Sequence, residues 1–145
     1  MPCNKDQFTE ANIPDLRGYV VIVTGGESFA HPVSPILSPE TESNISSTGN
    51  SGIGYQTSLQ LALRHARVYV AGRSEERVNK AIEDMQRIAG SMQLDLRFLQ
   101  LDLRNLNSVK AAAVAFKQKE QRLDILINNA GVSECILQPE SLTHD

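Results

Sequence analysis

Two glycine-containing stretches of this 145-residue chain have the residue types of a phosphate-binding turn. The first is the apolar, β-branched run 20–26, which ends in Thr24, Gly25 and Gly26 and reads as a buried strand that stops at a turn. The second is 50–54, Asn-Ser-Gly-Ile-Gly, which opens a helix. Joined directly, the two would form a strand–turn–helix junction. There, backbone N–H groups and a helix N-terminus can approach a pyrophosphate.

An irregular insertion over about 26–49 separates these two stretches. It holds three prolines and many Ser and Thr residues, and a structureless connection of this length is unusual inside a compact domain. One explanation is a genuine surface insertion. The other is a translated, unspliced intron, because Gly26-Glu27-Ser28 can be encoded with GTGAGT, a common intron start, and Thr48-Gly49 with an acceptor-like end. Genomic DNA across these codons distinguishes the two.

Hydrophobic periodicity predicts strands and helices in alternation. The strands are expected at Tyr19–Val23, Arg67–Ala71, Leu96–Leu101 and Leu123–Ile127. The helices are expected from Gly54 to about Arg64, from the N-cap Ser74 to Gly90, and around Val109, Ala112, Ala113 and Phe116. The second helix should bury Val78, Ala81, Ile82, Met85, Ile88 and Ala89. The fold class is therefore α/β, a partial Rossmann fold whose parallel sheet has about four strands in the order 3-2-1-4, with about three flanking helices.

Four motifs occur in order along this pattern. They are the split glycine loop, Ala71-Gly72-Arg73, Leu101-Asp102-Leu103 and Asn128-Asn129-Ala130-Gly131. With them the sequence resembles the short-chain dehydrogenase/reductase family, whose nucleotide loop is Thr-Gly-x-x-x-Gly-x-Gly. It is most similar to the branch of retinol dehydrogenase-type enzymes and fungal NADP-dependent oxidoreductases. The resemblance covers roughly 16–26 and 49–131, the N-terminal half of such an enzyme.

The resemblance implies an NADP-dependent oxidoreductase acting on an alcohol or ketone. Its glycine loop would use Thr24, Gly25, Ser51, Gly52, Ile53 and Gly54. In that loop Gly25 would make the tight turn, Gly52 would allow close approach of the backbone, and Gly54 would allow the helix to pack closely on the strand.

The other three motifs imply contacts along the rest of the cofactor. Arg73 follows the second strand, where a carboxylate would hold the ribose 2′-OH of NAD; a guanidinium suits the 2′-phosphate of NADP, so NADP is expected rather than NAD. Asp102 and Leu103 resemble the adenine-side contact. The family's wall along the nicotinamide ribose corresponds to Asn129, Ala130 and Gly131.

The family's catalytic residues have no counterpart in the sequence. The family uses a Ser and a Tyr closely followed by a Lys, but none of Tyr19, Tyr55 and Tyr69 precedes a Lys at that spacing, and Ser133 and Ser141 come too early. No catalytic residue is assigned, and the chain is expected to be inactive by truncation. The alternative function is therefore a non-catalytic fragment or intron-retaining product, at most a nucleotide-binding module.

Composition restricts the remaining functions. The net charge is −3, so nucleic-acid and membrane-surface binding are not expected. The longest apolar run is about five residues, against the ~20 that a membrane span needs, and no secretory signal is recognised. Cytoplasmic localisation is therefore expected, with free thiols at Cys3 and Cys135. The three histidines lack metal-ligand spacing, so no metal site is expected.

Two regions are predicted along the chain. Residues 1–16 should form a flexible leader, and residues 17–145 a truncated dinucleotide-binding domain that the 26–49 loop interrupts. The family's usual dimer-forming helices have no counterpart, so no native oligomer is predicted.

Overall fold

The structure, a computed structural model, describes residues 9–26 and 52–131. Its four strands form one parallel sheet in the order β3-β2-β1-β4. The strands are β1 (Val20–Thr24), β2 (Arg67–Gly72), β3 (Asp95–Gln100) and β4 (Ile125–Ile127). They alternate with the helices α1 (Ile53–Leu63), α2 (Glu75–Ala89) and α3 (Leu106–Lys119), and a short 3₁₀ helix, η1 (Glu10–Asn12), precedes them. The predicted α/β class, sheet order and three flanking helices are confirmed.

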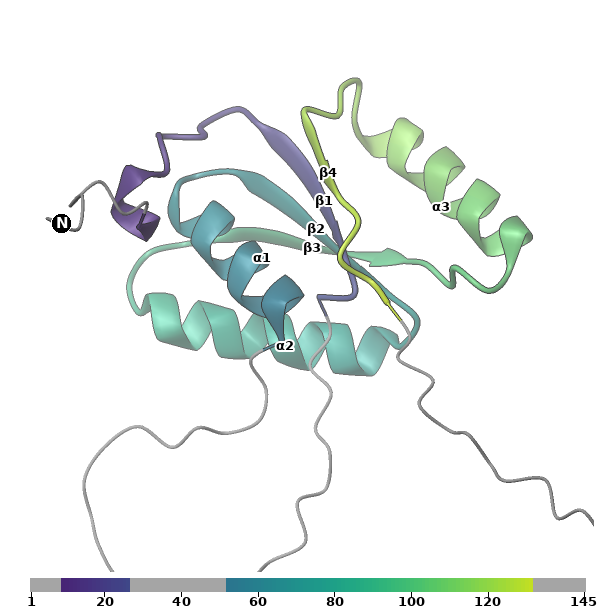
Figure 1. Cartoon of the computed structure of the whole chain (residues 1–145), viewed down its shortest axis with the longest axis horizontal. Helices are drawn as coiled ribbons and strands as arrows, with labels where there is room; N and C mark the ends of the chain where they lie inside the picture. Colours follow the sequence, from purple (N-terminus) through teal and green to yellow (C-terminus); the bar gives the residue numbers. More distant parts are fainter. Residues whose placement is uncertain (1–8, 27–51, 132–145) are drawn as a thin grey trace, which may run out of the picture.

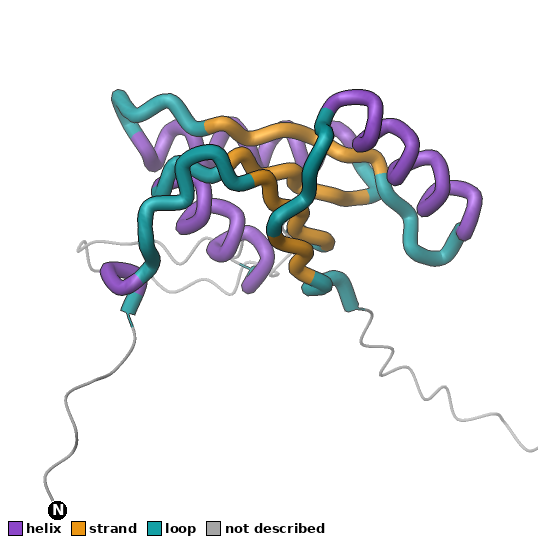
Figure 2. Tube along the Cα trace, turned by 90° about the horizontal axis from the view of Figure 1, so that it is seen from above, coloured by secondary structure: helices purple, strands orange, loops and turns teal. Residues whose placement is uncertain are grey.

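Helices cover both faces of the sheet, α1 and α2 on one and α3 on the other (Figures 1 and 2). Val21, Val23, Val68 and Val70 pack toward α1 and α2. The alternate strand residues, Val20, Ile22, Tyr69 and Ala71, pack toward Ala112 and Phe116 of α3. The two central strands, β1 and β2 from Val68 onward, read as continuous apolar runs because both of their faces are buried.

Two residues of the predicted helix stripes face solvent. Ile88 is 63% exposed, because it lies at the rim of the stripe in the last turn of α2. Ala113 is also exposed, because Ala112 and Phe116 define the inward line of α3 and the next residue turns about 100° away. The apolar pattern therefore predicts each helix correctly, but it includes more residues than the helix buries.

The N-terminal segment reaches the core. Leu16 is buried at 6% exposure, its N–H donates to the Arg64 carbonyl at 2.7 Å, and Ile13 packs on the same cluster. Residues 1–8, the insertion from 27 onward and residues 132–145 lie outside the described residues, so the predicted boundaries of leader and domain stay predictions. Among residues 9–26 and 52–131, no helix has both the length and the apolarity to cross a membrane.

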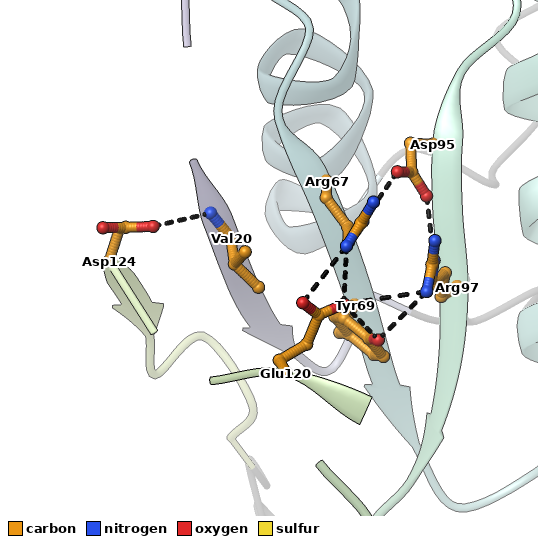
Figure 3. A network of polar contacts seen from close by, with 7 residues as sticks. All are labelled: Val20, Arg67, Tyr69, Asp95, Arg97, Glu120 and Asp124. Atoms are coloured by element: carbon orange, nitrogen blue, oxygen red, sulfur yellow. Dashed lines mark hydrogen bonds and ion pairs between the residues drawn. The ribbon is translucent and has the colours of Figure 1, made fainter. Parts of the chain in front are cut away.

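A polar network ties the start of β2 and β3 to the end of α3 (Figure 3). We call it the amino-edge network, and it consists of Arg67, Tyr69, Asp95, Arg97 and Glu120. The Glu120 carboxylate, whose side chain is 7% exposed, accepts from Arg67 Nη1 at 2.9 Å and from the Tyr69 hydroxyl at 2.8 Å. Asp95 accepts from Arg67 Nε at 2.7 Å and from Arg97 Nε at 2.9 Å. These bonds fix the register of β2 with β3 and hold the end of α3 against them, at the edge of the sheet where the strands begin.

Candidate functional site

The carboxyl ends of the four strands meet in one line at the opposite edge of the sheet. The Ala130 N–H donates to Thr24 Oγ1 at 3.0 Å, which joins the end of β4 to the end of β1. The Gly25 N–H donates to the Ala71 carbonyl at 2.9 Å, which joins β1 to β2. The Leu101 N–H donates to the Gly72 carbonyl at 2.9 Å, which joins β2 to β3. The four predicted motifs, although far apart in sequence, therefore lie side by side along one edge.

Gly25 and Gly54 occupy positions that exclude a side chain. Gly25 has a φ of +68°, a left-handed conformation, and a Cβ there would come within 2.8 Å of the Ala130 Cα. A Cβ on Gly54 would lie 2.3 Å from Asn129 Nδ2 and 2.7 Å from the Gly25 carbonyl oxygen. The geometry suits a tight turn at Gly25 and close helix–strand packing at Gly54.

The two sides of the predicted insertion lie together in the fold. A Cβ built on Gly26 would lie 2.6 Å from Val70 Cγ1 and 3.7 Å from the Gly54 carbonyl oxygen. The end of β1 and the start of α1 are therefore adjacent, as in an uninterrupted strand–turn–helix junction. Ser51, also assigned to the glycine loop, lies outside the described residues.

Gly52, Ile53 and Gly131 do not pack against the other described residues. Among residues 9–26 and 52–131, no atom beyond the chain neighbours lies within 4 Å of a Cβ built on Gly52 or on Gly131. Gly52 is the N-cap of α1 with φ −64° and ψ 157°, and it has no side chain to cap the helix. Ile53 is 79% exposed. The first N–H groups of α1 thus meet no other described residue at Gly52, and free N–H groups at a helix start are where an anion can bind.

Asn129 fastens the end of β4 to the glycine turn. Its side-chain Nδ2 donates to the Thr24 carbonyl at 3.0 Å and to the Gly25 carbonyl at 3.1 Å. Thr24 is buried at 4% exposure, and its hydroxyl donates to the Ile127 carbonyl at 3.3 Å. Thr24 and Asn129 thus shape the turn through contacts with the protein itself.

Arg73 lies in an open pocket just beyond β2 and β3. The pocket has a volume of about 330 Å³ and is lined by Arg73, Ser74, Arg77, Asp102 and Arg104. The Arg73 backbone is held by Gln100, whose Nε2 donates to the Arg73 carbonyl at 2.9 Å. Ser74 caps α2 by accepting from the Arg77 N–H at 3.4 Å.

Asp102, predicted at the adenine side, already holds a neighbouring arginine. Its carboxylate accepts from Arg104 Nε at 3.2 Å, from Arg104 Nη2 at 3.1 Å and from the Arg104 backbone N–H at 3.0 Å. These hydrogen bonds lower the pKa of Asp102 below its usual 3.8, with a smaller contribution from the charge of Arg73. The Asp102 N–H donates to Ser108 Oγ at 2.9 Å, and Leu103 beside it is 52% exposed. Asp102 is therefore ionised and oriented at neutral pH.

Arg77 and Arg104 line the pocket, although the sequence motifs did not predict them as site residues. Arg104 follows Asp102 by two residues, and a turn after β3 brings the two side chains together. Arg77 lies four residues after Arg73, in the first turn of α2. Both arginines follow a strand end predicted to reach the cofactor edge, and that position is the signal that could have revealed them.

Comparison with known proteins identifies similar chains. A family model described as short chain dehydrogenase matches residues 45–144. A short-chain dehydrogenase/reductase of Phomopsis amygdali is 40% identical over 125 residues, which are 86% of this chain and 30% of that protein. Dehydrogenase/reductase SDR family member 13 of Bos taurus is 42% identical over 120 residues, 83% of this chain and 31% of that protein. The chain spans about a third of the length of these curated relatives.

Solved structures show the same arrangement of elements. Menthone neomenthol reductase from Mentha piperita is 30% identical, with a TM-score of 0.59 over 79% of this chain and 32% of that one. The family match begins at residue 45, beyond β1, yet the structure pairs β1 between β2 and β4. The fold thus brings the end of β1, which the family match does not reach, to the same edge of the sheet as the ends of the other strands.

Proposed function

Because the chain belongs to the short-chain dehydrogenase family, we propose that its carboxyl edge binds the adenosine end of NADP. The chain would be the cofactor-binding half of an oxidoreductase that acts on a small alcohol or ketone. Gly25 and the residues at 51–54 would meet the pyrophosphate, with the buried Thr24 holding the turn beneath it. Asp102 and Leu103 would meet the adenine, and 129–131 the nicotinamide ribose. We also propose a cytoplasmic location.

The observation that carries this proposal is the hydrogen-bonded line of strand ends. It places Gly25 beside the start of α1, where N–H groups without helical partners and the positive end of the helix dipole favour an anion. Open parallel sheets bind ligands at this edge. Gly54 and Gly25 are in contact through backbone, so the cradle has the close packing that a phosphate turn requires.

The choice of NADP over NAD rests on the pocket beyond β2. A carboxylate at this position would accept hydrogen bonds from the hydroxyls of an unmodified ribose and would repel a phosphate. A guanidinium instead forms charge-assisted hydrogen bonds with a phosphate. Arg73 is exposed and lines that pocket. The residues present therefore fit the 2′-phosphate of NADP better than the free ribose of NAD.

Catalysis is not expected from this chain on its own. The nicotinamide supplies the hydride when the cofactor is bound, but carbonyl reduction also needs a proton donor and a group that stabilises the developing alkoxide. No Tyr in the sequence is followed by a Lys at the family's spacing. The residues of the chain would bind and orient the cofactor. We therefore favour the alternative function, a non-catalytic nucleotide-binding module.

The test is to titrate the purified full chain with NADPH by calorimetry and to assay it with a panel of ketones and quinones. We expect saturable binding without turnover, and we expect Gly52→Asp to abolish binding because it places a carboxylate in the anion's approach. Turnover that Gly52→Asp abolishes would overturn the non-catalytic assignment. An absence of NADPH binding would overturn the proposed function itself.

The insertion supplies a second test. Lengthening the turn about fivefold costs only ~1.4 kcal/mol in closure entropy, so the fold tolerates it, but a phosphate turn needs several N–H groups in one short geometry. We propose that deleting Gly26–Thr48 strengthens NADP binding, since the flanks already lie together at Gly25 and Gly54. Equal affinity with and without the segment would refute this. Genomic codons lacking GT and AG at the two boundaries would exclude the retained intron.

A further inference from the structure

The backbone of His65 adopts a conformation that favours glycine. Its φ is +70°, in the left-handed region, and among residues 9–26 and 52–131 no other non-glycine residue has a positive φ. His65 directly follows the last turn of α1, where helices often end on a left-handed glycine. The Ala66 N–H donates back to the Leu61 carbonyl at 3.2 Å, the hydrogen bond that closes such a helix end. A side chain is strained in this conformation, and the strain persists only where other contacts hold the residue.

The segment before β1 has hydrogen bonds of its own. We call residues 9–16 the N-terminal strap; it contains η1 and lies beside the turn between α1 and β2 (Figure 1). The Thr9 N–H donates to Asn12 Oδ1 at 2.7 Å, and the Asn12 N–H donates to the Thr9 carbonyl at 2.9 Å. The Ile13 N–H donates to the Glu10 carbonyl at 3.2 Å. The N-terminal strap therefore meets the rest of the fold as a structured unit.

Three polar contacts join the N-terminal strap to the end of α1. The Leu16 N–H donates to the Arg64 carbonyl at 2.7 Å. Arg64 Nη2 donates to the Glu10 carbonyl at 2.7 Å. His65 Nδ1 lies 3.0 Å from Asp15 Oδ1. The strained residue thus uses its side chain to hold the strap.

The contact between His65 and Asp15 involves a charged group at the surface. Hydrogen bonds from the His65 side chain and from the Arg17 N–H lower the pKa of Asp15 below its usual 3.8. Its carboxylate is therefore ionised at neutral pH and can only accept, so that His65 Nδ1 donates. The two side chains are 44% and 58% exposed. The contact can therefore open without leaving a buried charge unpaired.

The N-terminal strap buries little apolar surface beneath these contacts. Leu16 is 6% exposed, and Ile13 packs on the same cluster from a partly buried position. The other six residues of the strap are exposed. Segments with few buried apolar contacts open at a lower free energy than the core does.

We propose that the N-terminal strap is a detachable element that the contact of His65 with Asp15 latches to the end of α1. When this latch opens, the strap leaves as a unit while the sheet stays folded, and the apolar surface under Leu16 becomes accessible. The left-handed His65 supplies the imidazole of the latch at a cost to the helix end that a glycine would not have. The strap docks at the end of α1 that lies away from Gly52, so its opening does not require a bound nucleotide.

Amide hydrogen exchange of the full chain, followed by NMR, tests the latch with three reporters. The Leu16 N–H reports docking of the strap, because its acceptor is the Arg64 carbonyl. The Ala66 N–H reports the end of α1, and the Leu101 N–H, which donates to the Gly72 carbonyl, reports the sheet. Rates are corrected for the intrinsic exchange of each amide.

The variants are His65→Gly and Asp15→Ala. We expect His65→Gly to speed exchange at Leu16 about two- to fivefold, the range for an exposed ion pair. The same substitution should slow exchange at Ala66 by a similar factor, because glycine relieves the strain at the helix end. Asp15→Ala should speed exchange at Leu16 but change Ala66 little. The double variant should speed Leu16 no more than either single variant, because both remove the same contact.

The matched control is Asp84→Ala. It removes the acid of another ion pair, formed with Arg87 at 2.8 Å within α2, and should leave exchange at Leu16 unchanged. Circular dichroism checks that each variant retains the fold.

Two results would overturn the proposal. Exchange at Leu16 as slow as at Leu101 in the wild type would show that the strap opens only when the sheet unfolds. Exchange at Leu16 that neither His65→Gly nor Asp15→Ala accelerates would show that the two side chains form no latch.

Discussion

At the amino edge of the sheet two arginines and two acids neutralise one another, whereas at the carboxyl edge three arginines share a pocket with one carboxylate. The amino-edge network is also partly buried, since Glu120 is 7% exposed and Tyr69 is fully buried. Buried charges require partners, and an exposed group of like charges attracts oppositely charged ligands. The same residue types therefore hold the fold together at one edge and prepare it for an anion at the other.

Aromatic residues pack at the amino edge of the sheet, whereas glycines gather at its carboxyl edge. Tyr69 at the amino edge packs on Phe116 edge to face, with ring centroids 5.2 Å apart, and Arg97 lies over its ring at 5.9 Å. At the carboxyl edge Gly25, Gly52 and Gly54 leave room instead of filling it. Substitutions at the amino edge should therefore change stability, and those at the carboxyl edge should change binding.

Removal of the central acceptor should have the largest effect on stability. Glu120→Ala leaves Arg67 and Tyr69 without their shared carboxylate, and we expect it to lower the free energy of unfolding by about 2–3 kcal/mol, less than for a fully buried pair because Arg67 is partly exposed. Urea denaturation measures this. Glu120→Gln, which keeps an acceptor, should lose less. Equal losses for both variants would show that charge rather than hydrogen bonding dominates there.

Two glycine variants should separate packing from binding at the carboxyl edge. Gly54→Ala drives a Cβ into Asn129 and should cost about 1–3 kcal/mol of stability, and it should also weaken NADPH binding. Gly52→Ala meets no atom of the described residues and should change stability by less than about 1 kcal/mol. It should still weaken binding, because the methyl group occupies the anion's approach. Unchanged NADPH affinity for Gly52→Ala would remove Gly52 from the site.

Acid should affect the amino edge through Asp95. Burial raises the pKa of Asp95, but hydrogen bonds from Arg67 and Arg97 outweigh it, so that its pKa in the folded protein lies below the usual 3.8. A depressed pKa contributes stability above the unfolded-state value, and that contribution is lost as the pH falls from about 3.8 through the folded-state pKa. Unfolding monitored from pH 6 to pH 2 should show a smaller acid loss for Asp95→Asn. Identical slopes in wild type and variant would contradict the assignment.

Much of this architecture could be predicted from the sequence because its signals are local. The apolar runs of β1 and β2, the Ser74 cap and the stripe of α2 each lie within a few residues. The glycine positions could be predicted because their motif order matches a family.

The charged pairs could not be predicted in the same way. Arg67 meets Asp95 and Glu120 only once the register of β2 with β3 and the end of α3 are known, and a shift of one residue would turn the side chains to the other face. The contact of Asn129 with the glycine turn spans more than a hundred residues. The pairing of Arg104 with Asp102 depends on the turn after β3, which hydrophobic periodicity does not describe.

Backbone amide chemical shifts during an NADPH titration test the central claim most directly, because both edges are observed in one experiment. We predict shifts at Gly25, at 52–54, at Arg73 and around Asp102 and Asn129, with little change at Arg67, Asp95 and Glu120. Shifts centred on the amino-edge network, or no shifts at saturating NADPH, would contradict the assignment of stability to one edge and nucleotide binding to the other.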